Sequence, residues 1–159
     1  MGFAVGTPGE YDWISVAAKS AEEAWSRWCD HRGYAGCERI FNPEFVTRVA
    51  QWDGKHPDTI CPADWLRAGL GHCCERCGYE THCESGARIV AGEVVCEECI
   101  TFADRVAIDP EDAVEELANR IADEGEEDVR DDLIAKGEWP LVEGVWSRAV
   151  ADAAEDAVA

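Results

Sequence analysis

Four cysteines in two matched pairs constrain this chain more than any other feature of its sequence. Cys74 and Cys77 form the first pair, Cys96 and Cys99 form the second, and 18 residues separate the two pairs. Two thiolates spaced in this way can point at one ion from a tight turn, and two such turns complete a tetrahedron. Gly78 follows the first pair, where the turn needs a positive φ. The spacing therefore predicts a structural Zn²⁺ site formed by all four cysteines.

The residues between and after the two cysteine pairs have a pattern that predicts secondary structure. Residues 87–91 and 93–95 flank Gly92 and predict a β-hairpin, and the run Ile100-Thr101-Phe102-Ala103 predicts the start of a helix. This order of turn, hairpin, turn and helix resembles the zinc-ribbon and treble-clef families over residues 74–104. The resemblance implies a fold element held by zinc and no particular activity.

The other cysteines have a less regular pattern. The chain has 9 cysteines, and an odd number argues against a fully paired disulfide framework. Two groups of side chains could hold a second ion by composition alone: His72, Cys73, His82 and Cys83, and separately Cys29, His31, Cys37 and Cys61. Their separations are irregular, and cysteine is among the most buried residue types. We therefore interpret these residues as core and loop residues and leave a second site open.

The pattern along the chain predicts an α+β fold in three parts. Residues 1–71 are expected to form a small α+β domain, residues 72–103 the zinc-binding module, and residues 104–159 an acidic helical domain. The first domain is predicted to have the order β-α-β-β-α. Its expected strands and helices are Trp13–Ala17, a helix from Ser20 with Glu23 completing a capping box, Glu38–Phe41, Phe45–Trp52, and Pro62–Leu70.

Apolar residues recur at helical spacing throughout the third part. Asp109 and Pro110 are suited to the start of the first helix, and Gly125 separates it from a second helix over Glu126–Lys136. The positions predicted to face a core are Ala113, Val114, Leu117, Ala118 and Ile121, then Val129, Leu133 and Ile134, then Leu141, Val142, Val145, Trp146, Ala149, Val150, Ala153, Ala154 and Ala157.

Acidic residues dominate the charge of the chain. There are 34 acidic and 14 basic residues, for a formal net charge of -20, and residues 104–159 alone hold 18 acids and 5 bases, or -13. Such a surface repels nucleic-acid phosphates and attracts basic protein surfaces. Solubility alone is the competing explanation. The residues predicted to meet a basic partner are Glu124, Glu126, Glu127, Asp128, Asp131 and Asp132.

A second resemblance concerns residues 11–70. The short strand, the alanine-rich helix with Trp25 and Trp28, and the run from Val46 to Asp53 resemble small phage and prophage proteins of unknown function. Some acidic inhibitors of this kind, including certain anti-CRISPR proteins, imitate DNA. The resemblance implies a phage-encoded inhibitor that mimics DNA and blocks a nucleic-acid-binding host complex, without binding nucleic acid itself.

Two other classes of function are weighed against this one. A nucleic-acid-binding zinc-ribbon regulator would need a basic surface, yet residues 72–103 contain only two bases, Arg76 and Arg88, beside six acids. A small zinc enzyme is suggested superficially by His82 and Glu84 followed by the second cysteine pair, which partly matches the zinc deaminase signature. Val95 stands where that signature has proline, and four cysteines leave no open metal position. The sequence therefore predicts a protein without catalytic activity.

The sequence also carries expectations about location. No apolar run approaches the roughly 18 residues that span a bilayer. The first residues lack a basic stretch followed by an apolar one, so no signal peptide is predicted. We expect a cytoplasmic protein with no membrane contact.

Overall fold

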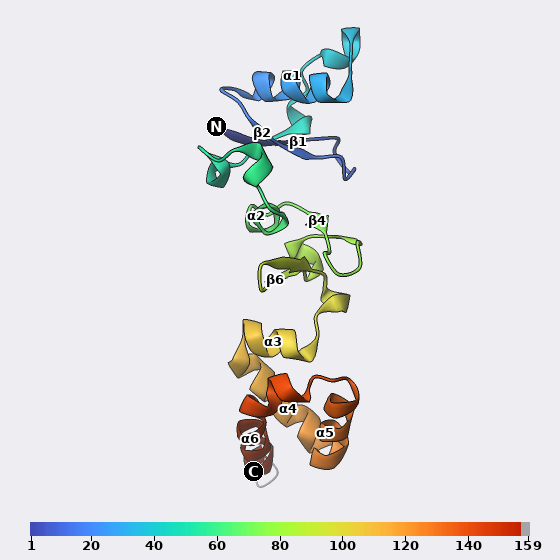
Figure 1. Ribbon diagram of the computed structural model, residues 1–159, viewed down its shortest axis with the longest axis vertical. Coiled ribbons are helices and arrows are strands. Elements are labelled where there is room, and N and C mark those ends of the chain that lie inside the picture. The colour runs from blue at the N-terminus through green and yellow to red at the C-terminus, as the bar shows by residue number, and fades with distance from the viewer. Residues whose placement is uncertain (157–159) are drawn as a thin grey trace. The chain divides into compact units, whose positions relative to one another are not determined.

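The computed structural model describes residues 1–156, apart from the side chains of residues 37, 38, 155 and 156. It confirms a mixed α+β fold that combines helices with small antiparallel sheets (Figure 1). The chain divides into two compact units, Met1–Cys96 and Glu97–Ala159. The division into three domains with boundaries after residues 71 and 103 stays a prediction.

A three-stranded antiparallel sheet organises the start of the first unit. Its strands are β1 (Gly2–Val5), β2 (Ile14–Ala17) and β3 (Val46–Arg48), in the spatial order β2-β1-β3. The central strand is buried along its whole length because both faces of the sheet are covered. Phe3 and Val5 pack with α1 (Ala21–Arg32), whereas Ala4 packs with Trp52 and Trp65 on the other face.

Aromatic side chains fill the core between the sheet and α1. Trp25 and Trp28 stack with ring centroids 4.9 Å apart, and Phe45 meets both rings edge-on. The indole of Trp25 donates a hydrogen bond to the carbonyl oxygen of Arg39. Large aromatic side chains bury much apolar surface in few residues, which suits a unit whose strands are only three or four residues long.

The predicted order of this region, β-α-β-β-α, is wrong. The observed order is β1-β2-α1-β3-α2, with α2 over Pro62–Arg67. The strand expected at Glu38–Phe41 is replaced by a 3₁₀ turn over Gly36–Arg39. The strand expected over Phe45–Trp52 shortens to β3, with a 3₁₀ turn on either side at Pro43–Phe45 and Ala50–Trp52.

The capping box predicted at the start of α1 forms only in part. Ser20 is the N-cap, and its hydroxyl accepts a hydrogen bond from the backbone N–H of Glu23 at 3.2 Å. The Glu23 carboxylate accepts from the backbone N–H of Lys19 at 2.9 Å. It also accepts from Arg27, one turn further along the helix. The reciprocal half of the predicted capping box is therefore shifted by one residue.

Two short hairpins complete the first unit. Strands β4 (His72–Cys73) and β5 (Glu80–Thr81) pair around the first cysteine pair, and β6 (Arg88–Val90) and β7 (Glu93–Val95) form the predicted hairpin around Gly92. The adjacent core is small, with Leu66, Ala87 and Val94 buried and Ile89 packed against them.

The second unit is helical. It contains α3 (Phe102–Ile108), α4 (Pro110–Glu124), α5 (Glu126–Ala135) and α6 (Trp139–Asp156). Asp109 caps α4 through its side chain, as the sequence predicts. Its described core cluster contains the buried residues Phe102, Ala113, Val114, Leu117, Ala118, Ile121, Val129, Leu133, Val142, Trp146, Ala149 and Ala153.

Three of the predicted core positions in this unit are wrong. Ile134 is 50% exposed and Leu141 is 65% exposed, and Ala154 is exposed as well. The predicted stripes were too wide because α5 and α6 each bury a narrow face against α4. Ala157 lies outside the described residues. No described helix is both long and apolar enough to cross a bilayer.

Candidate metal centre

The first cysteine pair lies in a tight turn between β4 and β5. The N–H of Cys74 donates to the carbonyl of Tyr79 at 2.7 Å, and the N–H of Gly78 donates back to the carbonyl of Cys74 at 2.8 Å. Gly78 has φ +78°, a left-handed conformation that side chains other than glycine rarely adopt. The glycine after the second cysteine therefore allows the turn that brings both sulfurs to one side.

Two hydrogen bonds of Glu75 connect this turn to the second hairpin. The backbone N–H of Glu75 donates to the carbonyl of Val94 at 2.8 Å, and its carboxylate accepts from the N–H of the same residue at 2.7 Å. Val94 lies two residues before Cys96, so the two bonds set the distance between the cysteine pairs. Sequence reasoning missed Glu75 because a single glutamate inside a C-x2-C pair has no distinctive spacing.

The second pair follows β7 directly. Cys96 comes one residue after the strand, and Cys99 ends a 3₁₀ turn over Glu97–Cys99. Thr101 then caps α3, accepting from the N–H of Asp104 while the Asp104 carboxylate accepts from the N–H of Thr101. The strand end and the capped helix thus define both ends of the second turn.

The structure brings the four predicted cysteines together. Their sulfur atoms all lie within 4.8 Å of one another, and the sulfurs of Cys77 and Cys96 are 3.6 Å apart. A tetrahedral Zn²⁺ with Zn–S bonds of about 2.3 Å places its sulfurs about 3.8 Å apart. The donor set and its size are thus compatible with zinc. Cys74 and Cys96 are buried, Cys99 is half-buried and Cys77 is exposed.

The surroundings of Cys74 favour a thiolate. Burial opposes ionisation of this thiol, but hydrogen bonds from the backbone amides of Cys96, Cys77 and Arg76 outweigh the burial and lower its pKa to about 6. Metal ligation requires the deprotonated sulfur. Backbone amides aimed at a buried sulfur are therefore what a thiolate ligand needs.

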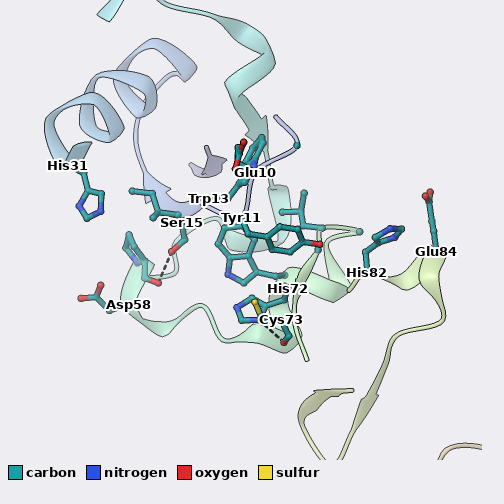
Figure 2. A pocket seen from close by; sticks show the side chains of 17 residues that line it. Glu10, Tyr11, Trp13, Ser15, His31, Asp58, His72, Cys73, His82 and Glu84 are labelled. Carbon is teal, nitrogen blue, oxygen red and sulfur yellow. Dashed lines mark hydrogen bonds between the residues drawn. The ribbon is translucent and has the colours of Figure 1, made fainter. Parts of the chain in front are cut away.

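This arrangement could hold a metal ion in a closed shell of ligands. Four thiolates fill the tetrahedral shell of a zinc ion and leave no position for water or substrate. His82 and Glu84, the residues that suggested a deaminase-like site, are not members of the cluster. They line a separate cavity together with His72 and Cys73 (Figure 2).

The alternative second site is not assembled in the described structure. Among residues whose side chains are described, the four cysteines are the single group of three or more metal-ligating side chains close enough to share an ion. Cys29 is buried in the core under α1, as interpreted from the sequence, whereas Cys61 and Cys83 are exposed. Cys37 has no described side chain.

The predicted partner-binding acids fall into two groups. Glu124 and Asp132 both accept hydrogen bonds from Arg120, at 3.1 and 3.0 Å. The bond to Glu124 lies within α4, whereas the bond to Asp132 connects α4 to α5. Arg120 lowers the pKa of Glu124, and Lys136 followed by Arg120 lowers that of Asp132. The other four are exposed: Glu126, Glu127, Asp128 and Asp131.

Comparison with known proteins adds no relative to this description. The chain matches no protein-family model, no curated protein and no solved structure. The phage and anti-CRISPR resemblance therefore gains no support, and function has to be argued from the site and the surface.

Proposed function

We propose that this chain is a non-catalytic binding protein that zinc stabilises and whose acidic helical unit binds a basic protein surface. The observation that carries the first part is the closed set of four cysteine sulfurs, which suits a structural ion and leaves no position for catalysis. The second part rests on the concentration of negative charge in residues 104–159, with 18 acids against 5 bases.

The described structure indicates which acids are available to a partner. Glu124 and Asp132 are both paired with Arg120, Glu124 within α4 and Asp132 across from α5 to α4. Glu126, Glu127, Asp128 and Asp131 are exposed on α5, and none forms an ion pair with a described side chain. Three of them lie in the first turn of the helix, where negative charge also complements the helix dipole. A binding role therefore has to be separated experimentally from local stabilisation.

The sharper form of this proposal is a DNA mimic. Carboxylates on one helix would occupy the basic channel of a nucleic-acid-handling complex in place of phosphates, as an anti-CRISPR-like inhibitor would. The second candidate is a nucleic-acid-binding zinc ribbon, for which the cysteine cluster is the supporting observation and the excess of acids is the opposing one.

The zinc component is tested by substituting adjacent cysteines. Metal content is measured by mass spectrometry on purified wild type and on the variants Cys74→Ser and Cys73→Ser. We expect one zinc per chain in the wild type and in Cys73→Ser, and less than one in Cys74→Ser, because only Cys74 belongs to the cluster. Equal metal content in both variants, or none in the wild type, would contradict the site.

The binding component is tested by an affinity pull-down from lysate. Replacing Glu127, Asp128 and Asp131 by lysine should abolish recovery of a basic partner without unfolding the helical unit. A control variant replaces Glu44, Glu143 and Asp152 by lysine, because it changes the net charge equally from exposed positions elsewhere. If both variants lost the partner equally, the loss would be explained by net charge alone and not by a binding surface on α5.

Added DNA separates the two candidates. Release of a captured protein by DNA supports the mimic, whereas co-purified nucleic acid with no protein partner supports the zinc-ribbon alternative and overturns the proposed function.

A further inference from the structure

A cavity of about 910 Å³ lies within the first unit, apart from the cysteine cluster. Its lining comes from the loop between β1 and β2 and the start of β2, from His31 on α1, from Pro57 and Asp58, and from the segment that runs from Trp65 to Glu84 (Figure 2). Cavities of this size hold drug-sized molecules, for which the usual range is about 300–1,000 Å³. The cavity is therefore large enough for a small organic ligand.

Aromatic and apolar side chains form much of its wall: Tyr11, Trp13, Ile14, Trp65 and Leu70. Trp13 is fixed in place, because its indole N–H donates to the carbonyl of Thr7 at 2.9 Å and its ring lies against Gly6. A Cβ at Gly6 would be 2.4 Å from that ring, so no other residue fits there. The tryptophan wall is thus preorganised by backbone contacts.

Tyr11 forms a more exposed part of the wall. It is 45% exposed, and its hydroxyl would lie 3.2 Å from a Cβ placed on Gly71. Burial raises the pKa of this hydroxyl, and the negative charge of Glu80 raises it further. The electrostatic environment around Tyr11 therefore disfavours additional negative charge.

The charged residues of the lining have one sign. Glu10, Asp58 and Glu84 contribute carboxylates, whereas no lysine or arginine of the described chain lines the cavity. Figure 2 shows Asp58 and Glu84 on opposite sides of the aromatic cluster. The nearby guanidinium of Arg32 is engaged elsewhere, 3.1 Å from the carboxylate of Asp12. The cavity therefore combines aromatic faces with three carboxylates, and no lysine or arginine stands among its described lining residues.

We infer that this cavity binds a small organic cation, of the quaternary or alkylated ammonium class. The faces of tryptophan and tyrosine attract such a cation through their quadrupoles, and the carboxylates add a longer-range attraction. An inorganic cation gains little from the apolar wall, and an anion is repelled by the carboxylates. This assignment is independent of the proposed protein-binding surface, which lies on α5 in the second unit.

The test uses the zinc-loaded full chain and three probes of similar size. Phenyltrimethylammonium is the cation, tert-butylbenzene is its neutral analogue, and benzenesulfonate is the anion. Binding is followed by calorimetry at constant ionic strength. Chemical shifts of the tryptophan indole N–H groups report where each probe binds. We expect the cation to bind most tightly, with shifts at Trp13 and Trp65.

Two variants, each with a matched control, separate the contribution of the Tyr11 ring to cation binding from the contribution of charge. Tyr11→Leu removes the aromatic face and should weaken cation binding about two- to fivefold, whereas Tyr11→Phe should bind like the wild type. Glu84→Gln should weaken binding of the cation and leave binding of tert-butylbenzene unchanged. Glu44→Gln is the matched control, because it removes the same charge from an exposed residue outside the cavity.

Every outcome of these binding measurements either supports or overturns the cation-binding assignment. Cation-selective binding that depends on the ring of Tyr11 and on Glu84 supports the assignment. Equal binding of the neutral analogue would show an apolar cavity without charge selection, and it would overturn the assignment. Equal weakening by Glu84→Gln and Glu44→Gln would trace the effect to net charge and would also overturn it. No binding at millimolar concentration would do the same.

Discussion

At the scale of single residues, Asp53 connects the start of the central strand, β1, to the segment that follows β3. One carboxylate oxygen accepts from the backbone N–H of Gly2 at 2.8 Å, and the other accepts from Arg48 at 2.5 Å. Arg48 also donates to the carbonyl of Gly2 at 3.1 Å. These bonds, first that from Gly2 and then that from Arg48, lower the pKa of Asp53.

We predict that Asp53→Asn destabilises the protein near neutral pH and that the difference from the wild type disappears in acid. The folded-state pKa lies below the unfolded one, so the stabilisation is complete above the unfolded value. It is lost as the pH falls through the folded value. Urea unfolding of both proteins between pH 7 and pH 3 measures this, with Glu44→Gln as the exposed control. A difference that stays constant as the pH is lowered would contradict the prediction.

Single residues also show where sequence reasoning succeeds and where it stops. The four cysteines were predicted because a C-x2-C turn is a local structure, so its spacing is visible in the sequence. Glu75 and Tyr11 were missed because their roles depend on residues far along the chain, Val94 and Gly71. Asp132 could not be separated from the exposed acids of α5 in the sequence for a similar reason, since its pairing with Arg120 depends on the packing of α5 against α4.

At the scale of elements, helices were predicted better than strands. The start of α1 illustrates why, because Ser20 and Glu23 form a local capping arrangement.

We predict that Ser20→Ala lowers the free energy of unfolding by about 1 kcal/mol, since one backbone N–H of the first turn loses its acceptor. Urea unfolding followed by tryptophan fluorescence measures the loss, and Ser20→Thr should retain most of the stability. Equal loss in both variants would assign the effect to something other than the cap.

Strand β1 was missed for a physical reason. It is four residues long and buried on both faces, so it lacks the alternation of apolar and polar residues that marks a half-buried strand. The segments mistaken for strands, residues 38–41 and 45–52, contain several apolar and aromatic side chains, yet 3₁₀ turns take up residues 38–39, 45 and 50–52. Pairing along β1 limits β3 to three residues. Local preference therefore could not determine the order of the elements.

At the scale of the whole molecule, the apolar residues gather into separate clusters of very different size. Two clusters stabilise the sheet, α1 and α2, and a large one stabilises α3 to α6. The cluster beside the cysteines contains only three buried residues and Ile89. So small a core cannot offset the conformational entropy of the hairpins around it. We therefore expect the hairpins to depend on an ion bound by the four cysteines, whereas the helical unit has a core of its own.

Metal removal should consequently destabilise one part of the chain and spare another. We predict that a chelator increases hydrogen exchange at the amides of β6 and β7 on the order of a hundredfold or more, because the metal-binding free energy of such a site is folding free energy. Amides of α4 and α6 should keep their protection, since every buried residue of their core lies between Phe102 and Ala153. Exchange followed by mass spectrometry with and without chelator measures both regions, and re-added Zn²⁺ should restore the protection of the β6 and β7 amides.

Unchanged exchange in β6 and β7 would contradict a structural role for the metal. Simultaneous loss of protection in α4 and α6 would instead show that the helical unit does not fold independently.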